Sequence, residues 1–254
     1  MFDSKKVCSI LYIILLTIVN GNIIPRKPIA SESNDFDLLI FTQHWPPTVC
    51  YKWKTNSASH KCYFPKEKDE WSIHGLWPSQ LHKLGPQFCN KSLVFNSTAL
   101  KPLIKQLQEK WIDVQEGTES SSLWQHEWNK HGTCAVVIEQ LNTEYKYFAK
   151  GLNLLATYDM KHVLAKANII PGKAYAKADI LHAIEKVLGK RGAIMCQKNQ
   201  QTGESYIFEI RICFDKTLQL IDCDGIYGYP TNCDNSKLVT YLSEVPHGYT
   251  VVQM

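Results

Sequence analysis

Eight of the nine cysteines, spread from Cys50 to Cys233, constrain the fold of this chain more than any other feature of its sequence, whereas Cys8 lies in an N-terminal segment that we expect to be removed. An even number of cysteines in an exported protein is typical of a disulfide framework, here of four bridges. None of the eight lies in the C-x-x-C spacing of a structural zinc cluster, which argues against such a cluster. We expect neither a metal nor another cofactor. Spacing does not determine the pairing, although short loops favour Cys50 with Cys62 and Cys213 with Cys223.

The N-terminus predicts the export that such a framework requires. Two lysines precede the apolar run "VCSILYIILLTIV", which ends shortly before the small residue Gly21. A short apolar run behind positive charges is typical of a secretory signal peptide, and it is too short to cross a bilayer comfortably. We therefore assign residues 1–21 to a signal peptide and expect a secreted, lysosomal or vacuolar protein without a membrane segment after cleavage. The sequons at Asn90 and Asn96 are consistent with N-glycosylation on that route.

Hydrophobic periodicity divides the remainder into strands and helices after a loose, proline-bearing leader over residues 22–35. The predicted strands are the buried run Phe36–Trp45, a short piece in 71–79 that ends in a Gly and Pro turn, and a hairpin from 204–215 and 217–223. The predicted helices lie within 96–111, 143–160 and 177–189, and another begins in 123–134. The polar stretch 48–70 is interpreted as a disulfide-closed loop, and the tail after Cys233 has no clear pattern. One α+β domain over residues 36–254 is the simplest account.

The segment "LWQHEWNKHGTC", residues 123–134, carries the densest group of reactive side chains. A zinc-protease helix would need H-E-x-x-H, because histidines four apart share one helix face. Here His126 and His131 are five apart, which separates them by about 140° on a regular α-helix. This spacing argues against a shared metal.

Counting from Glu127 gives a different site. His131 lies four residues after Glu127, and Lys130 lies three after it, so one helix face presents a carboxylate, an ammonium and an imidazole. A solvated polar face with ordinary charge pairing fits the segment equally well. The flanking Trp124 and Trp128 favour a reactive face over a solvated one, because large aromatic side chains are rarely left in water.

A second group lies in "WSIHGLWP", where His74 is followed by a glycine. A lone histidine in a turn is more often a packing residue than a reactive one. Gly75 permits close approach of backbone or ligand, however, and Trp77 offers a flat surface on which a base can stack. In "TQHWPP", Gln43 and His44 lie at the end of a buried strand, where side chains often line pockets.

Two histidines, a glutamate and a lysine suit the cleavage of RNA by internal phosphoryl transfer. That reaction needs a base for the 2′-OH proton, an acid for the leaving 5′-oxygen and positive charge for the phosphorane oxygens. Histidines perform both proton transfers near neutral pH, and no metal is required. DNA lacks the 2′-OH and is not a substrate for this chemistry.

The two motifs "IHGLWP" and "HEWNKHGTC" resemble the two active-site boxes of the ribonuclease T2 family, the secreted acid ribonucleases. "FTQHWPPTVC" is similar to the first strand of that family, and "TEYKYFAKGLNL" to its helix after the second box. The similarity covers most of residues 36–233. It implies an α+β fold with a central antiparallel sheet flanked by helices, RNA as substrate through a 2′,3′-cyclic phosphate, and an acid optimum. Nothing in the sequence demands oligomerisation, so we expect a monomer.

The resemblance also implies roles for individual residues. His131 corresponds to the general base and His74 to the general acid, while Glu127 and Lys130 stabilise the transition state. His126 and Trp77 correspond to residues that hold phosphate and substrate, and Gln43 to a base contact. The implied disulfides are Cys50 with Cys62, Cys89 with Cys134, Cys196 with Cys233, and Cys213 with Cys223.

One position departs from the family pattern. Many members carry an acidic residue after the proline of the first box, and this chain has Ser79 there. The departure leaves catalysis intact and puts the base preference in doubt. A second hypothesis is a secreted binding or signalling protein that keeps the same fold and has only incidental ribonuclease activity.

Overall fold

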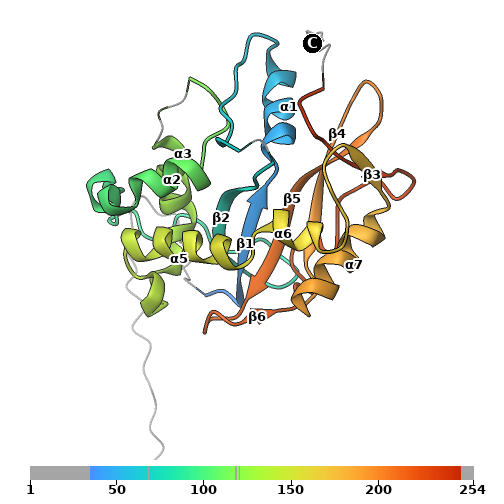
Figure 1. Ribbon diagram of the computed structural model, residues 1–254. Helices are drawn as coiled ribbons and strands as arrows, with labels where there is room; N and C mark the ends of the chain where they lie inside the picture. Colours follow the sequence, from blue (N-terminus) through green and yellow to red (C-terminus); the bar gives the residue numbers. More distant parts are fainter. Residues whose placement is uncertain (1–34, 68, 118, 120, 247–254) are drawn as a thin grey trace, which may run out of the picture. The chain divides into compact units, whose positions relative to one another are not determined.

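The computed structural model describes residues 35–67, 69–117, 119 and 121–246. The predicted signal peptide, and all of the leader except Asp35, lie outside these residues. The described part contains a seven-stranded sheet and helices packed against it (Figure 1). The strands are β1 Leu38–His44, β2 Ser72–Ser79, β3 Lys173–Tyr175, β4 Ala193–Lys198, β5 Ser205–Phe214, β6 Leu220–Ile221 and β7 Val239–Tyr241. The α-helices are α1 Pro46–Asn56, α2 Ile104–Lys110, α3 Ser122–Glu127, α4 Thr133–Ala135, α5 Glu144–Thr157, α6 Met160–Ala165 and α7 Lys177–Leu188.

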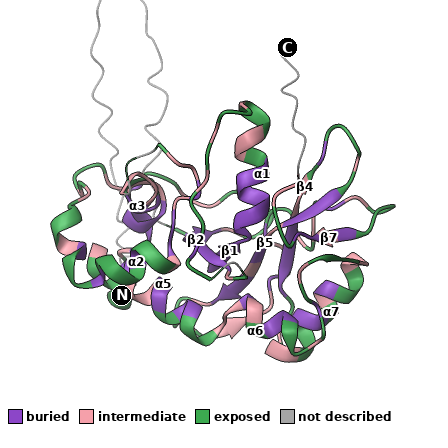
Figure 2. Ribbon diagram, turned by 45° about the horizontal axis from the view of Figure 1, so that its top comes forward, coloured by how far each residue is buried: buried purple, intermediate pink, exposed green. Residues whose placement is uncertain are grey.

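The sheet runs in the order β2-β1-β5-β7-β3, with β4 and β6 also paired to β5. Every pairing is antiparallel except β5 with β7, which is parallel. Strand β1 is buried along its whole length, as expected for a continuous apolar run between two neighbours (Figure 2). The α+β class and the central sheet are therefore as predicted, with one parallel pair added by the tail that the sequence left unassigned.

Two predictions for the N-terminal part are wrong. Residues 48–70 are not all loop, because α1 begins at Pro46, where prolines at the first helical positions start the helix rather than only end the strand. The piece 71–79 has no turn, since β2 continues through Gly75 and Pro78. It does so at the edge of the sheet, where the missing N–H of a proline is tolerated.

The helix predictions hold in outline. The expected helix 96–111 is a 3₁₀ turn, Ser97–Leu103, followed by α2, and its cap is Asn96, whose side chain accepts from the Thr98 N–H. The expected helix 143–160 ends at Thr157, and Asp159 caps the separate helix α6. Helix α7 ends at Gly189 in the left-handed conformation, as a glycine C-cap requires. No helix among the described residues has the length and apolar character needed to cross a membrane.

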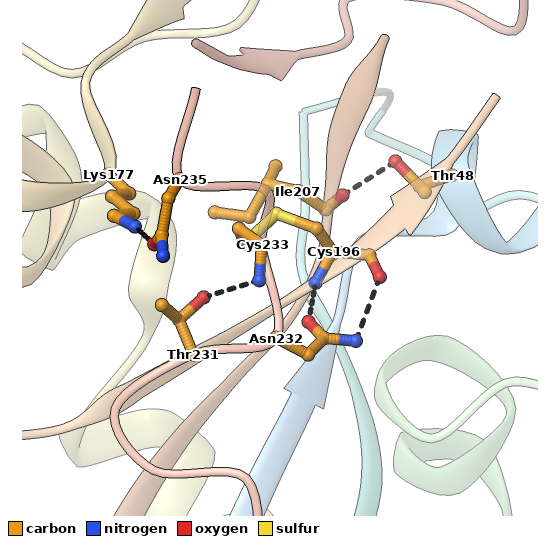
Figure 3. Close-up of a disulfide and its surroundings, with 8 residues drawn as sticks. All are labelled: Thr48, Lys177, Cys196, Ile207, Thr231, Asn232, Cys233 and Asn235. Atoms are coloured by element: carbon orange, nitrogen blue, oxygen red, sulfur yellow. Dashed lines mark hydrogen bonds between the residues drawn. A yellow bond between two sulfur atoms is a disulfide. The ribbon is translucent and has the colours of Figure 1, made fainter. Parts of the chain in front are cut away.

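The C-terminal tail is joined to β4 by the Cys196–Cys233 disulfide (Figure 3). Beside it, the Asn232 side chain accepts from the backbone N–H of Cys196 at 2.7 Å and donates to the carbonyl of Cys196 at 3.3 Å. The Thr231 hydroxyl accepts from the Cys233 N–H. These bonds fix the segment around Asn232 against the end of the sheet that holds the cleft described below.

Candidate active site

A cleft of about 500 Å³ opens over β2, β4 and β5 and is closed on one side by the segment that follows α3. Six of the residues singled out from the sequence line it: His74, Trp77, His126, Glu127, Lys130 and His131. The two active-site motifs, some fifty residues apart in the chain, thus meet in one cavity.

His74 is directed into the cleft by an irregularity of β2. Thr42 of β1 pairs with Gly75 and Gln43 pairs with Ile73, so the register skips His74. Such a β-bulge re-aims the side chain of the extra residue. The backbone carbonyl of His74 accepts from the Trp111 indole N–H at 3.0 Å, which fixes the bulge against the core.

The second motif contains an irregularity of a different kind. Between α3 and α4, residues Trp128–Gly132 form a π-helical turn, in which the Thr133 N–H bonds to the Trp128 carbonyl. The Thr133 hydroxyl donates to the Asn129 carbonyl at 2.9 Å, and the Phe88 N–H to the Lys130 carbonyl at 2.9 Å. Single π turns of this kind occur frequently at functional sites.

Because of the π turn, the angular separation expected for His126 and His131 on a regular α-helix does not apply. The turn widens the helix by one residue, so that His126 and His131, five apart, both line the cleft. Burial and the charges of Lys130, His74 and His126 together lower the pKa of His131 well below its usual value. Among the described residues, no group of three or more His, Cys, Asp or Glu side chains is arranged to hold a metal ion.

Two glycines leave space for side chains of the two motifs. A Cβ on Gly75 would lie 2.0 Å from the Trp77 Nε1 and 2.1 Å from the Glu127 Oε2. Those two atoms form a hydrogen bond of 2.7 Å, which joins the first motif to the second. A Cβ on Gly132 would lie 2.3 Å from the Trp128 ring. The close approach predicted for Gly75 is therefore that of the Glu127 carboxylate.

His74 and His131 have opposite surroundings, although each ring lies near Trp77, with centroid distances of 5.0 Å for His74 and 5.3 Å for His131. The His74 Nδ1 lies 2.7 Å from the Glu209 Oε1. The His131 Nδ1 is buried without a hydrogen-bond partner. Burial by itself lowers the pKa of His74, but the hydrogen bond to Glu209 and the negative charges of Glu209 and Glu127 outweigh it and raise the pKa.

Glu127 is almost fully buried, at 1% exposure. This burial raises its pKa to about 7, against the opposing effects of His74, the Trp77 N–H and Lys130. His126 is more open, and burial and the charge of Lys130 lower its pKa.

The family assignment follows from comparison with known proteins. The sequence pattern described as "Ribonuclease T2 family" matches residues 36–223, which include both motifs. The chain belongs to the ribonuclease T2 family.

Individual relatives agree with this assignment. Ribonuclease Oy of Magallana gigas is 34% identical over 82% of this chain and 96% of its own length. The crystal structure of human RNase T2 superposes with a TM-score of 0.66 and 32% identity, covering 82% of this chain and 99% of that one. RNase NT in complex with 5′-AMP gives a TM-score of 0.68 and 28% identity, covering 82% and 98%. The protein is therefore an endoribonuclease of the T2 family.

The four disulfides implied by the family resemblance are all present. Cys50–Cys62 closes the loop after α1, and Cys89–Cys134 anchors the end of the π turn. Cys213–Cys223 closes the β5–β6 hairpin. The two pairings favoured by loop length alone are among them.

The assignment of Gln43 as a base contact is wrong for this T2 chain. Its side chain is 1% exposed, donates to the Tyr158 carbonyl at 2.7 Å and accepts from the Met160 N–H at 3.1 Å. Gln43 therefore holds the junction between α5 and α6. Side chains alternate along a strand, and it is the neighbouring His44 that faces the active site, with its ring stacked at 5.3 Å on that of His74.

Two residues of the T2 site, Glu209 and Arg211, were not predicted from the sequence, and His44 was expected only to line a pocket, with no role assigned to it. His44 lines a second pocket of about 300 Å³ that also reaches His74, and its Nε2 has no partner. Burial and the charge of His74 lower the pKa of His44 to about 3. Glu209 and Arg211 lie in β5, where two charges with a spacing of two in an apolar strand are the one available signal, and that signal also fits a solvated face.

Proposed function

We propose that this protein cleaves single-stranded RNA by transphosphorylation through a 2′,3′-cyclic phosphate, without a metal. His131 takes the proton of the attacking 2′-OH, and His74 gives a proton to the leaving 5′-oxygen. The observation that carries the proposal is the contrast between two imidazoles near one tryptophan, one held by a buried carboxylate and the other desolvated next to cations. Titratable groups whose surroundings separate their pKa values divide into acid and base in this way.

The same surroundings support an acid optimum. The mechanism requires His131 unprotonated and His74 protonated, and the lowered pKa of His131 and raised pKa of His74 satisfy both in mildly acidic solution. Glu127 has a pKa of about 7, so below that pH it carries a proton that it can donate to a phosphate oxygen. Above pH 7 the ionised Glu127 carboxylate would repel the phosphate, so we expect it to contribute to a fall in activity.

The remaining cleft residues suit phosphate and nucleoside binding. Lys130 supplies positive charge to the phosphorane oxygens, the more exposed His126 is close enough to feel that charge, and Trp77 lies near both His74 and His131. The pocket at His44 adjoins the His74 side of the cleft, where the nucleoside that carries the leaving oxygen would lie. Ser79 also lines the cleft and offers a hydroxyl where many family members have a carboxylate, so the base preference is left open by this assignment.

The cellular setting completes the proposal. Residues 1–21 act as a signal peptide and 36–254 as a single ribonuclease domain, which is secreted or delivered to a lysosome or vacuole as a monomer. One relative that is 31% identical is named an extracellular ribonuclease, from Solanum lycopersicum. Asn90 and Asn96 are exposed or half-exposed and carry N-glycans in this proposal.

The test is digestion of single-stranded RNA at pH 5 in EDTA, with the products analysed by mass spectrometry. We expect cleavage to fragments that end in 2′,3′-cyclic phosphate, and a loss of rate of about 100-fold or more in His131→Phe. No cleavage in EDTA, or equal cleavage of an RNA with 2′-deoxyribose at every position, would contradict the proposal. In the absence of cleavage, a binding or signalling protein on the same fold becomes the better hypothesis.

A further inference from the structure

One buried charged side chain at the active site contacts a catalytic histidine but takes no part in the proton transfers proposed above. Glu209 lies in the middle of β5, with a side chain that is 3% exposed, at the floor of the cleft. Burying an ionised carboxylate is costly unless its oxygens are paired, so the partners of Glu209 indicate what it does.

Each carboxylate oxygen of Glu209 has a different partner. Oε1 lies 2.7 Å from the His74 Nδ1. Oε2 accepts from Arg211 twice, at 3.1 Å from Nε and 2.7 Å from Nη2. Arg211 in turn lies over the Trp77 ring, 5.4 Å from its centroid. Glu209 is thus held between an arginine that keeps it ionised and a histidine that it orients.

The contact at Nδ1 determines the state of the His74 ring. A carboxylate accepts but does not donate, so the hydrogen on Nδ1 points at Glu209 and Nε2 is left for the substrate. The backbone of His74 is fixed separately by the Trp111 indole. Position and tautomer of the proposed proton donor therefore depend on two contacts outside the two sequence motifs.

We propose that Glu209 is a positioning residue for the proton donor His74, which it orients and keeps protonated, with Arg211 as the counterion that keeps Glu209 ionised. The inference rests on the proposed role of His74. It predicts that the pH above which turnover falls is determined partly by a carboxylate on β5.

The titratable and charged groups around His74 determine how readily it holds its proton. They are Glu209 and Arg211 on β5, Glu127 and His126 on α3, His131 in the π turn and His44 on β1. Burial opposes ionisation of Glu209, but the hydrogen bond and charge of His74 and the charge of Arg211 lower its pKa to about 2. Because the raised pKa of His74 depends on that charge, loss of the carboxylate moves it downward.

The first test is Glu209→Gln, which keeps size and an acceptor but removes the charge. We expect the basic limb of the kcat/KM profile to move to lower pH by about one unit or more, because the charge of Glu209 that raises the pKa of His74 is lost. Glu209→Ala also removes the orientation, and we expect a fall in kcat of about 100-fold with KM nearly unchanged. Glu204→Gln, the same change on the exposed turn just before β5, is the control and should match the wild type.

A second readout separates this inference from the proposed function. The titration of His74, followed by NMR, should shift downward in Glu209→Gln whether or not RNA is cleaved. If Glu209→Gln does not fold because Arg211 is left without a counterion, Glu209→Gln/Arg211→Met removes both charges. The His74 titration should then still shift downward, but by less, because the charge of Arg211 itself lowers the pKa of His74. A His74 titration and a basic limb that both superpose on the wild type would overturn the proposal, whereas an inactive wild type with a shifted titration would overturn only the proposed function.

Discussion

At the scale of single residues, the carboxyl group of Glu127 makes the site sensitive to pH near neutrality. It is buried, and its one hydrogen bond from a neighbouring side chain comes from the Trp77 N–H. Its pKa in the folded protein is about 7, against 4.5 without the fold. Since the folded pKa is raised, the stabilisation of the protonated form is fully present below pH 4.5 and is lost as pH rises through 7.

Glu127→Gln should remove this dependence. Between pH 4.5 and 8 we expect the wild type to lose about 3 kcal/mol more of its free energy of unfolding than the variant, from 1.36 kcal/mol per unit of pKa shift. Urea unfolding at a series of pH values measures the difference. Parallel curves for the two proteins would show that Glu127 ionises as easily in the fold as outside it.

Most of the residues that we assign to the reaction could be predicted from the sequence, but the residues that position them could not. His74, Glu127, Lys130 and His131 were predictable because the two motifs place them at fixed spacing. Glu209 was not, because a glutamate in an alternating strand looks the same whether its face meets solvent or a histidine. Gln43 was assigned to the wrong face, because neighbouring positions on a strand cannot be told apart without the register.

At the scale of elements, the π turn Trp128–Gly132 places Lys130 and His131. In a turn of this kind, some backbone carbonyls lose their regular helical hydrogen bond. The Thr133 hydroxyl donates a hydrogen bond to one of them, the carbonyl of Asn129. Sequence periodicity at 3.6 residues does not predict it, since one extra residue in a helix leaves the apolar pattern almost unchanged.

Thr133→Ala tests the importance of that hydroxyl. We expect a loss of about 1–2 kcal/mol in stability and of about tenfold or more in kcat, because His131 is displaced when the turn relaxes. Thr157→Ala is a matched control, since its hydroxyl makes the same bond to a carbonyl four residues back, at 3.0 Å, on the exposed face of α5. Equal kinetics in the two variants would show that the turn is held by other contacts.

At the scale of the whole molecule, each of the four disulfides attaches a loop or the C-terminal tail to a helix or strand. The Cys196–Cys233 bridge spans 37 residues and joins β4 to the tail, and both Cys196 and Asn232 line the cleft. The strands β3 and β7, which lie outside the hairpin that the sequence predicted, are too short to be recognised by periodicity. Their place in the sheet depends on the tail that this bridge attaches.

Replacing Cys196 and Cys233 together by alanine should lower the free energy of unfolding by about 4 kcal/mol, from the closure of a loop of that length. The KM for RNA should rise, since one wall of the cleft is released, with a smaller effect on kcat. Denaturant unfolding and steady-state kinetics test the two effects. A double variant that is less stable but has an unchanged KM would separate the bridge from the site.

The bulge at His74 has a consequence for protein design. Together with the π turn and a second register shift opposite Phe208 in β5, it makes the cleft a meeting point of backbone irregularities. A redesign that replaced them with ideal strands and an ideal helix would keep the hydrophobic core and gain stability. It would also turn His74 away from the cleft and return His131 to regular helical spacing, so that the resulting protein would outlast its parent on heating and leave RNA intact.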